Sequence, residues 1–151
     1  MKKLLVIIAA ALLFSVAASA QPKAAGLRLG YGAELSYQHY LGSNFIEADL
    51  GFLGGAGTYL TGIYNFHLGE AGNFNFYAGP GASVGYAVIV RRHDNVTERS
   101  RGFSAAVAGQ VGAAYEFQAI PLDLSIDWRP AYDLGLGFRW QGLALGVRYR
   151  F

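Results

Sequence analysis

The sequence of 151 residues contains no cysteine. This absence excludes disulfide bonds, thiolate nucleophiles, cysteine-based metal sites and a lipid anchor attached through cysteine. Long hydrophobic runs are also missing, because no apolar segment after residue 20 approaches the roughly 20 residues that a membrane-spanning helix needs. Lysine is nearly absent as well, since only Lys23 follows residue 20. A soluble surface rich in Lys and Glu is therefore not expected.

Residues 1–20 have the pattern of a secretory signal peptide. Lys2 and Lys3 form a basic start, residues 4–16 are apolar, and Ala18-Ser19-Ala20 is a small-residue cleavage site. The apolar core is too short for an uncleaved anchor helix. We therefore expect a cleaved signal peptide over residues 1–20 and one exported domain over residues 21–151.

The exported domain is formally neutral. Removing Lys2 and Lys3 leaves 10 of the 12 Lys and Arg residues against 10 Asp and Glu residues. A neutral domain argues against a nucleic-acid partner. Hydrophobic residues make up 53% of the chain and charged residues 15%, whereas charged residues are about a quarter of a typical soluble domain. An apolar chain without long apolar runs must alternate its apolar residues, which indicates β-strands.

Alternation of period two recurs along the chain and is clearest at the C-terminus. There, Leu143, Leu145, Val147, Tyr149 and Phe151 alternate with Ala144, Gly146, Arg148 and Arg150. Residues 45–53, 73–86, 103–116 and 121–129 repeat the pattern, and 58–67 has a strand-like composition. A single strand over 24–41 would give seven strands, but bacterial barrels have an even number. Dividing that stretch at Gly32-Ala33 predicts an all-β fold, an eight-stranded antiparallel transmembrane β-barrel.

The connections follow from this count if Phe151 lies on the periplasmic side. Short turns are expected at residues 42–44, 68–72 and 118–120, and outer loops at 54–57, 90–102 and 132–139. Pro80 falls within a predicted strand and has no N–H for the ladder. A local bulge or bend is therefore expected at this position.

The apolar stripe is predicted to face lipid. The opposite stripe consists mostly of small residues, which suit the crowded interior of a barrel only eight strands wide. Aromatic residues lie at the predicted strand ends, as in the girdles of outer-membrane barrels. The alternative is a soluble periplasmic lipocalin-like lipid-binding barrel, in which the same alternation would turn the apolar face inward.

Seven charged residues fall on the predicted inward stripe. Buried charges must pair, because each unpaired one costs several kcal/mol. We expect a network of ion pairs that fills the interior, whereas a narrow gated ion path is the alternative. The seven residues are Arg28, Glu47, Asp49, Asp123, Asp127, Arg129 and Arg148.

Four arginines, Arg91, Arg92, Arg99 and Arg101, occupy the predicted outer loop 90–102. The guanidinium group matches the geometry of phosphate. Outer-membrane lipids are therefore expected partners, with the lipid phosphates contacting these side chains. The alternative, which the mixed charges of residues 91–101 favour, is a solvated loop whose charges cancel one another.

No enzyme, metal site or cofactor is predicted. His39 and His67 map to strand ends and His93 to the loop, so no Ser, His and carboxylate converge as a lipid-modifying enzyme would require. That enzyme is the less favoured alternative function. No protein partner is indicated by a motif.

The ending Leu-Ala-Leu-Gly-Val-Arg-Tyr-Arg-Phe resembles the terminal signal that the barrel assembly machinery reads, with Val147, Tyr149 and Phe151 on one face. Residues 59–64, 77–81 and 120–130 resemble small outer-membrane β-barrel proteins of Bacteroidota. This resemblance covers most of residues 21–151. It implies a porin-like or OmpA/OmpX-like barrel in the outer membrane, a family mostly without an assigned activity. The short outer loops expected here weaken an adhesin interpretation.

Overall fold

The computed structural model describes residues 22–52, 57–93, 96–135 and 137–151. The predicted signal peptide, residues 1–20, and most of the predicted loop 54–57 lie outside the described residues. The fold is all-β, and no helix of the described part is long and apolar enough to cross a membrane. The strands are β1 (Lys23–Leu29), β2 (Ala33–Leu41), β3 (Asn44–Phe52), β4 (Gly57–Ala71), β5 (Phe74–His93), β6 (Val96–Glu116), β7 (Leu122–Trp128), β8 (Ala131–Asp133), β9 (Gly137–Arg139) and β10 (Leu143–Arg150).

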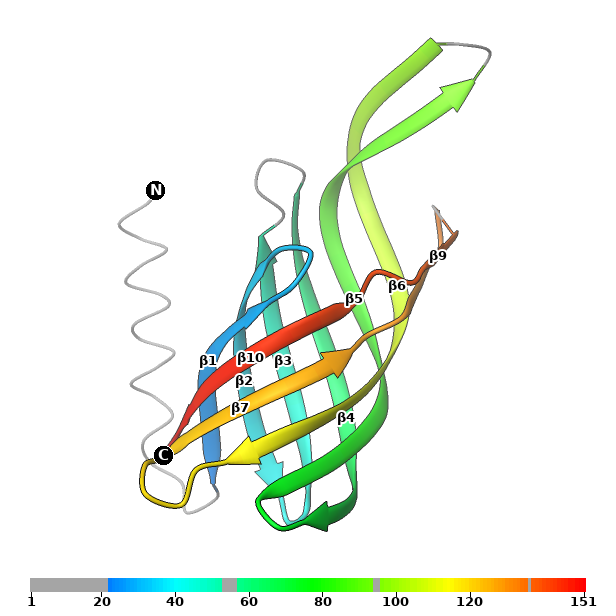
Figure 1. The fold of residues 1–151 in the computed structure, drawn as a ribbon. Helices are drawn as coiled ribbons and strands as arrows, with labels where there is room; N and C mark the ends of the chain where they lie inside the picture. The colour runs from blue at the N-terminus through cyan, green and yellow to red at the C-terminus, as the bar shows by residue number, and fades with distance from the viewer. Residues whose placement is uncertain (1–21, 53–56, 94–95, 136) are drawn as a thin grey trace, which may run out of the picture.

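The strands form one antiparallel sheet. Its order is β5-β4-β3-β2-β1-β10-β7-β6-β8-β9, and β5 additionally pairs with β6. Each of the strands β1–β7 and β10 therefore has a hydrogen-bonded neighbour on both sides. The first and last strands also pair, with Ala24 opposite Arg150. Figure 1 shows these strands side by side around a common axis.

The ten strands correspond to the eight expected from the sequence. β7 and β8 continue one register along β6, because Trp128 is opposite Val111 and Ala131 is opposite Ala108. The break between them falls at Pro130, which has no N–H to donate. β9 pairs with β8, so the predicted outer loop 132–139 is partly a short hairpin. The first hairpin turns between Leu29 and Ala33, which confirms the division predicted there.

The longest hairpin corrects the prediction of an outer loop over residues 90–102. β5 and β6 are 20 and 21 residues long and stay paired as far as His93 and Val96. Figure 1 shows this hairpin projecting beyond the other strands. Val88, Ile89 and Val90 have high strand propensity, and cross-strand pairing extends this preference through the charged residues that follow.

The predicted turn 68–72 and the predicted bulge at Pro80 are both wrong in position. β4 continues to Ala71, and the chain reverses at Gly72, whose φ of 63° favours glycine. The register shift lies between His67 and Gly69. Pro80 keeps its place opposite Gly109 in the ladder with β6. In the ladder with β4, Gly79 and Pro80 have no paired residue, but the register is the same on both sides of them, so no bulge forms there.

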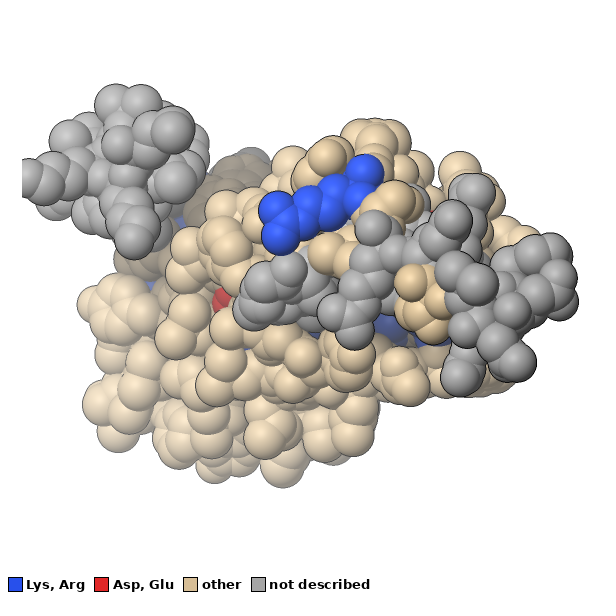
Figure 2. Space-filling view, turned by 90° about the horizontal axis from the view of Figure 1, so that it is seen from above, with Lys and Arg blue, Asp and Glu red and all other residues tan. Residues whose placement is uncertain are grey.

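Alternation gives the sheet an apolar outer face and a polar inner face. On the outer face, Leu145 is 62% exposed and Ile126 is 50% exposed. On the inner face, Arg148 and Asp127 are only 1% and 2% exposed. Viewed from above, most of the visible surface of the described residues carries no charge (Figure 2). This polarity is the reverse of that expected for a lipocalin-like barrel.

Candidate functional site

The seven charged residues predicted for the inward stripe are all buried. Six of them contact one another through ion pairs and hydrogen bonds, and Glu34 joins them. The seventh, Asp123, lies apart and pairs with Arg150. We call the connected group the interior cluster. It consists of Arg28, Glu34, Glu47, Asp49, Asp127, Arg129 and Arg148.

Arg129 connects opposite sides of the sheet. It follows the last residue of β7, and its Nη2 lies 2.9 Å from Glu47 Oε1 and 2.5 Å from Asp49 Oδ2. Both carboxylates are on β3, which is four strands from β7 in either direction along the pairing order. A single side chain can make these contacts only if the sheet curls around a narrow interior.

Glu47 is the centre of the interior cluster and has no solvent exposure. Besides Arg129, its carboxylate accepts a hydrogen bond from Arg148 Nη2 at 3.1 Å and from Gln38 Nε2 at 2.6 Å. Gln110 Nε2 lies 3.4 Å away. One carboxylate on β3 thus links β2, β6, β10 and the end of β7. Because a one-residue slip would turn Glu47 to the apolar face, these bonds fix the register.

Arg28 organises the end of the cluster that lies nearest the long hairpin. Its Nε and Nη2 donate to Asp127 Oδ1 at 2.8 and 2.5 Å, and its Nη1 donates to Glu34 Oε2 at 2.8 Å. Glu34 also pairs with Arg129 at 3.3 Å and accepts a hydrogen bond from the Tyr59 hydroxyl at 2.8 Å. Both oxygens of Glu34 are therefore engaged.

Arg148 is held by neutral groups as well as by Glu47. Its Nε donates to Ser36 at 2.9 Å and its Nη1 to Ser125 at 2.7 Å.

The cluster as a whole contains three guanidinium groups and four carboxylates. Asp49 Oδ1 and Asp127 Oδ2 are buried without a hydrogen-bond partner. The interior therefore holds more acidic than basic groups.

Sequence reasoning did not identify Glu34, Ser36 and Gln38 as members of this interior. All three are buried, and they alternate along β2 with Leu35 and Tyr37. The same period-two pattern used for the other strands would have revealed them. Gln110 and Ser125 lay on the polar stripes of their strands but were not selected, since they carry no charge.

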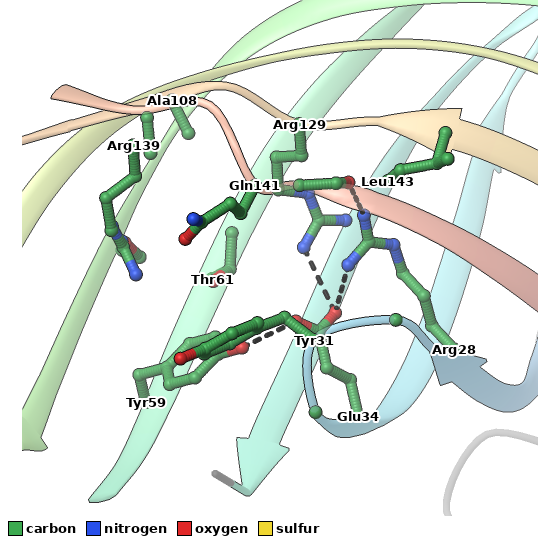
Figure 3. Close-up of a pocket in the computed structure, with 15 residues that line it drawn as sticks. Arg28, Tyr31, Glu34, Tyr59, Thr61, Ala108, Arg129, Arg139, Gln141 and Leu143 are labelled. Carbon is green, nitrogen blue, oxygen red and sulfur yellow. Dashed lines mark hydrogen bonds and ion pairs between the residues drawn. The ribbon is translucent and has the colours of Figure 1, made fainter. Parts of the chain in front are cut away.

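A cavity of about 60 Å³ lies at the hairpin end of the interior, the end from which β5 and β6 project. Figure 3 shows Arg28, Arg129 and Glu34 at this cavity, with Tyr59 bonded to Glu34 and Arg139 on the opposite side. Arg28 and Arg129 are committed to the carboxylates of the cluster. The charges around this cavity are thus mostly compensated.

A second cavity, of about 180 Å³, lies at the opposite end. We call this the short-turn end, because it holds the turns after β2 and β4. Gln38, Tyr40 and Glu116 are among the residues that line the cavity. Gln38 also donates to Glu47, while Arg129 lines the first cavity and donates to the same carboxylate. The contacts of Glu47 therefore connect the walls of the two cavities.

The remaining predicted residues lie outside the interior. Val147, Tyr149 and Phe151 are exposed, and the rings of Tyr149 and Phe151 stack with centroids 6.3 Å apart. Arg101 is exposed on β6. The backbone of Arg91, Arg92 and Arg99 belongs to the long hairpin, but their side chains lie outside the described part of the structure. Among the described residues, no group of three or more His, Cys, Asp or Glu could hold a metal ion.

Comparison with solved structures supports the fold. The N-terminal β-barrel domain of Pseudomonas aeruginosa OprF superposes with a TM-score of 0.59 at 16% identity, over 87% of this chain and 96% of that chain. Neisserial surface protein A (NspA) gives a TM-score of 0.53 at 16% identity, over 87% and 94%. A de novo designed transmembrane β-barrel gives 0.50 at 14%, over 86% and 95%. No protein-family model and no curated protein matches the sequence. The fold is that of outer-membrane β-barrels.

Proposed function

We propose that this protein is an integral outer-membrane β-barrel, closed by eight transmembrane strands and filled by the interior cluster. Its role is structural or porin-like, without a defined substrate and without enzymatic activity. A signal peptide over residues 1–20 directs export and is removed, leaving residues 21–151 as the barrel domain. The reversed polarity of the sheet is the observation that carries this proposal.

The outer face supports a lipid environment. Large apolar side chains are exposed on every strand from β1 to β7 and on β10, so the apolar surface is continuous around the sheet. A water-soluble monomer rarely exposes a contiguous apolar patch of more than a few hundred Å². In a bilayer the same surface contacts acyl chains. Rings at the short-turn end form the girdle expected at a membrane interface, namely Phe66, Phe74, Phe76, Tyr115, Phe117, Tyr149 and Phe151.

The finer assignment follows the resemblance to small outer-membrane barrels of Bacteroidota and to the OmpA/OmpX type. Val147, Tyr149 and Phe151 serve as the signal for the barrel assembly machinery, since they form one exposed apolar row along β10 and the residue that follows it. Outer-membrane lipids are the principal partners. Arg101 and its neighbours Arg91, Arg92 and Arg99 supply guanidinium groups for lipid phosphates at the hairpin end.

The porin-like alternative rests on the two cavities. The interior cluster separates the cavities, and its groups are joined by short hydrogen bonds, so we expect the native barrel to conduct little. Planar-bilayer recordings test this point. Current at the empty-membrane baseline agrees with a filled interior, whereas stable conductance steps from the native protein establish an ion path instead.

Cell fractionation combined with gel migration tests the main proposal. We expect the protein in the outer-membrane fraction, and we expect unheated samples to migrate differently on SDS gels from boiled ones, because closed barrels resist SDS until heated. Recovery in the soluble periplasmic fraction would overturn the proposal. Mass spectrometry of the purified protein separately tests cleavage after Ala20.

A further inference from the structure

The cavity at the short-turn end has an excess of negative charge. Glu70 and Glu116 line it, and no lysine or arginine does so within the described residues. Glu116 pairs with Arg150 at 2.7 Å, and Arg150 also pairs with Asp123 at 3.0 Å. The guanidinium of Arg150 is therefore shared between the carboxylates of Glu116 and Asp123. Within the described residues, Glu70 pairs with His67 alone, at 3.5 Å, and that ring is charged only when protonated.

One wall of the same cavity is aromatic. Tyr40, Phe45 and Tyr77 all line it. The ring centroids of Tyr40 and Phe45 lie 5.3 Å apart, and those of Phe45 and Tyr77 lie 5.2 Å apart, so the three rings form a continuous surface. The face of an aromatic ring attracts a cation, and the attraction is greatest where water is excluded. An aromatic wall beside one carboxylate that shares its guanidinium and one that pairs with a histidine favours a positively charged, partly apolar ligand.

The wall also contains a polar atom without a partner. Tyr77 is 2% exposed, and its hydroxyl oxygen has no hydrogen-bond partner. The volume of about 180 Å³ admits several water molecules or one small molecule. It is below the roughly 300–1,000 Å³ of sites for drug-sized ligands. These dimensions restrict the ligand to a small molecule.

We propose that the short-turn cavity binds a small organic cation with an ammonium group. Glu70 and Glu116 supply the opposite charge, and the rings of Tyr40, Phe45 and Tyr77 contact the ammonium substituents. A metal ion fits less well, because the described residues provide no cluster of three acidic or histidine ligands here. This site goes beyond the proposed function, which requires no ligand.

Titration of the folded protein with choline chloride tests the proposal. The protein, held in non-ionic detergent micelles, is followed by NMR or calorimetry, with 3,3-dimethylbutan-1-ol as the neutral analogue of the same shape and sodium chloride as the ionic control. We expect saturable binding of choline that is about tenfold tighter than that of the neutral analogue. Equal binding of both compounds, or no saturable binding, overturns the proposal.

Two substitutions locate the site. Glu70→Gln removes a charge from an exposed side chain and should weaken choline binding about two- to fivefold, as loss of an exposed ion pair does. Tyr40→Leu removes one ring and should weaken binding to a similar extent. Glu98→Gln, on β6 in the long hairpin, is the matched control and should leave binding unchanged.

The outcomes separate this site from the proposed function. Each variant is first checked for heat-modifiable migration, so that loss of folding is not mistaken for loss of binding. Unchanged choline binding in both Glu70→Gln and Tyr40→Leu would show that the cation binds elsewhere and would end this assignment. A folded, membrane-located protein that binds no cation would leave the barrel proposal intact.

Discussion

The two ends of the interior differ in how many guanidinium groups pair with their carboxylates. At the hairpin end, Arg28 and Arg129 are each bonded to two or more carboxylates, and Glu34 is engaged through both oxygens. At the short-turn end, one guanidinium serves Glu116 and Asp123. The hairpin end and the centre therefore hold the strands together, whereas at the short-turn end two carboxylates share the guanidinium of Arg150. Substitutions should accordingly cost stability in the first region and alter binding in the second.

The largest loss is expected from Glu47→Ala. This change leaves Arg129 and Arg148 without a shared carboxylate in a fully buried position. Breaking a buried ion pair on one side costs about 3–5 kcal/mol. Urea unfolding of the vesicle-inserted protein, followed by tryptophan fluorescence, measures the free energy of unfolding. An unchanged unfolding midpoint would show that Glu47 is not the centre of the network.

Two arginines on one strand provide a matched comparison. Arg148 and Arg150 lie two residues apart on β10, but their side chains are 1% and 29% exposed. Arg148→Gln should lower the free energy of unfolding by about 3 kcal/mol, because Glu47 loses a buried partner. Arg150→Gln should cost less, about 1–2 kcal/mol, because its pair with Glu116 is partly exposed and only Asp123 is a buried partner. Equal losses in the same urea titration would contradict the difference between the centre and the short-turn end.

Two tyrosine hydroxyls test the same contrast with a smaller change. Tyr59 donates to the Glu34 carboxylate at 2.8 Å, whereas Tyr40 donates to the neutral oxygen of Gln38 at 3.2 Å. Tyr59→Phe should cost about 1.5 kcal/mol and Tyr40→Phe about 0.5 kcal/mol, since hydrogen bonds to charged groups are stronger. Thermal unfolding in matched micelles gives the order of the two. The reverse order would place the stronger constraint at the short-turn end.

The smallest effect is expected at Arg139. Its side chain is exposed at the edge of the hairpin-end cavity, and none of its contacts is an ion pair or hydrogen bond in the described structure. Arg139→Gln should change the free energy of unfolding by less than about 0.5 kcal/mol. A loss comparable to that of Arg148→Gln, measured in the same urea titration, would show that Arg139 compensates the acidic interior at long range.

Alternation along each strand was enough to predict which residues face inward. Arg28, Glu47 and Arg148 could be assigned by parity alone, because a strand presents every second side chain to one face. Their partners could not be predicted, because pairing across the interior depends on the order of strands around the sheet. Arg129 and Glu47, for example, are 82 positions apart. Glu34 lies at the start of the strand predicted over residues 34–41, and it was missed because the inward and outward faces of that strand were not assigned.

The errors in the connections have a common cause. The charges between Arg91 and Arg101 favoured a loop, yet cross-strand pairing continues through them as far as His93 and Val96. A charged composition indicates that a segment is exposed to water. A hairpin that projects beyond the other strands is exposed as well, so composition alone does not distinguish it from a loop. The bulge was assigned to Pro80 because of its missing N–H, whereas the structure shifts register between His67 and Gly69. Local chemistry indicated a possible defect but not where the ladder would accommodate it.

The pairing of β1 with β10 has a consequence for the order of events during folding. Ala24 can meet Arg150 only after nearly the entire described chain has been made. Until β1 and β10 pair with each other, each presents an unpaired edge of N–H and C=O groups, which other chains could join. Bringing such distant segments together also carries a loop-closure cost that local hairpins avoid. The edge of β1 therefore stays unpaired until β10 reaches it, and we expect the chain to be most prone to aggregation before these two strands pair.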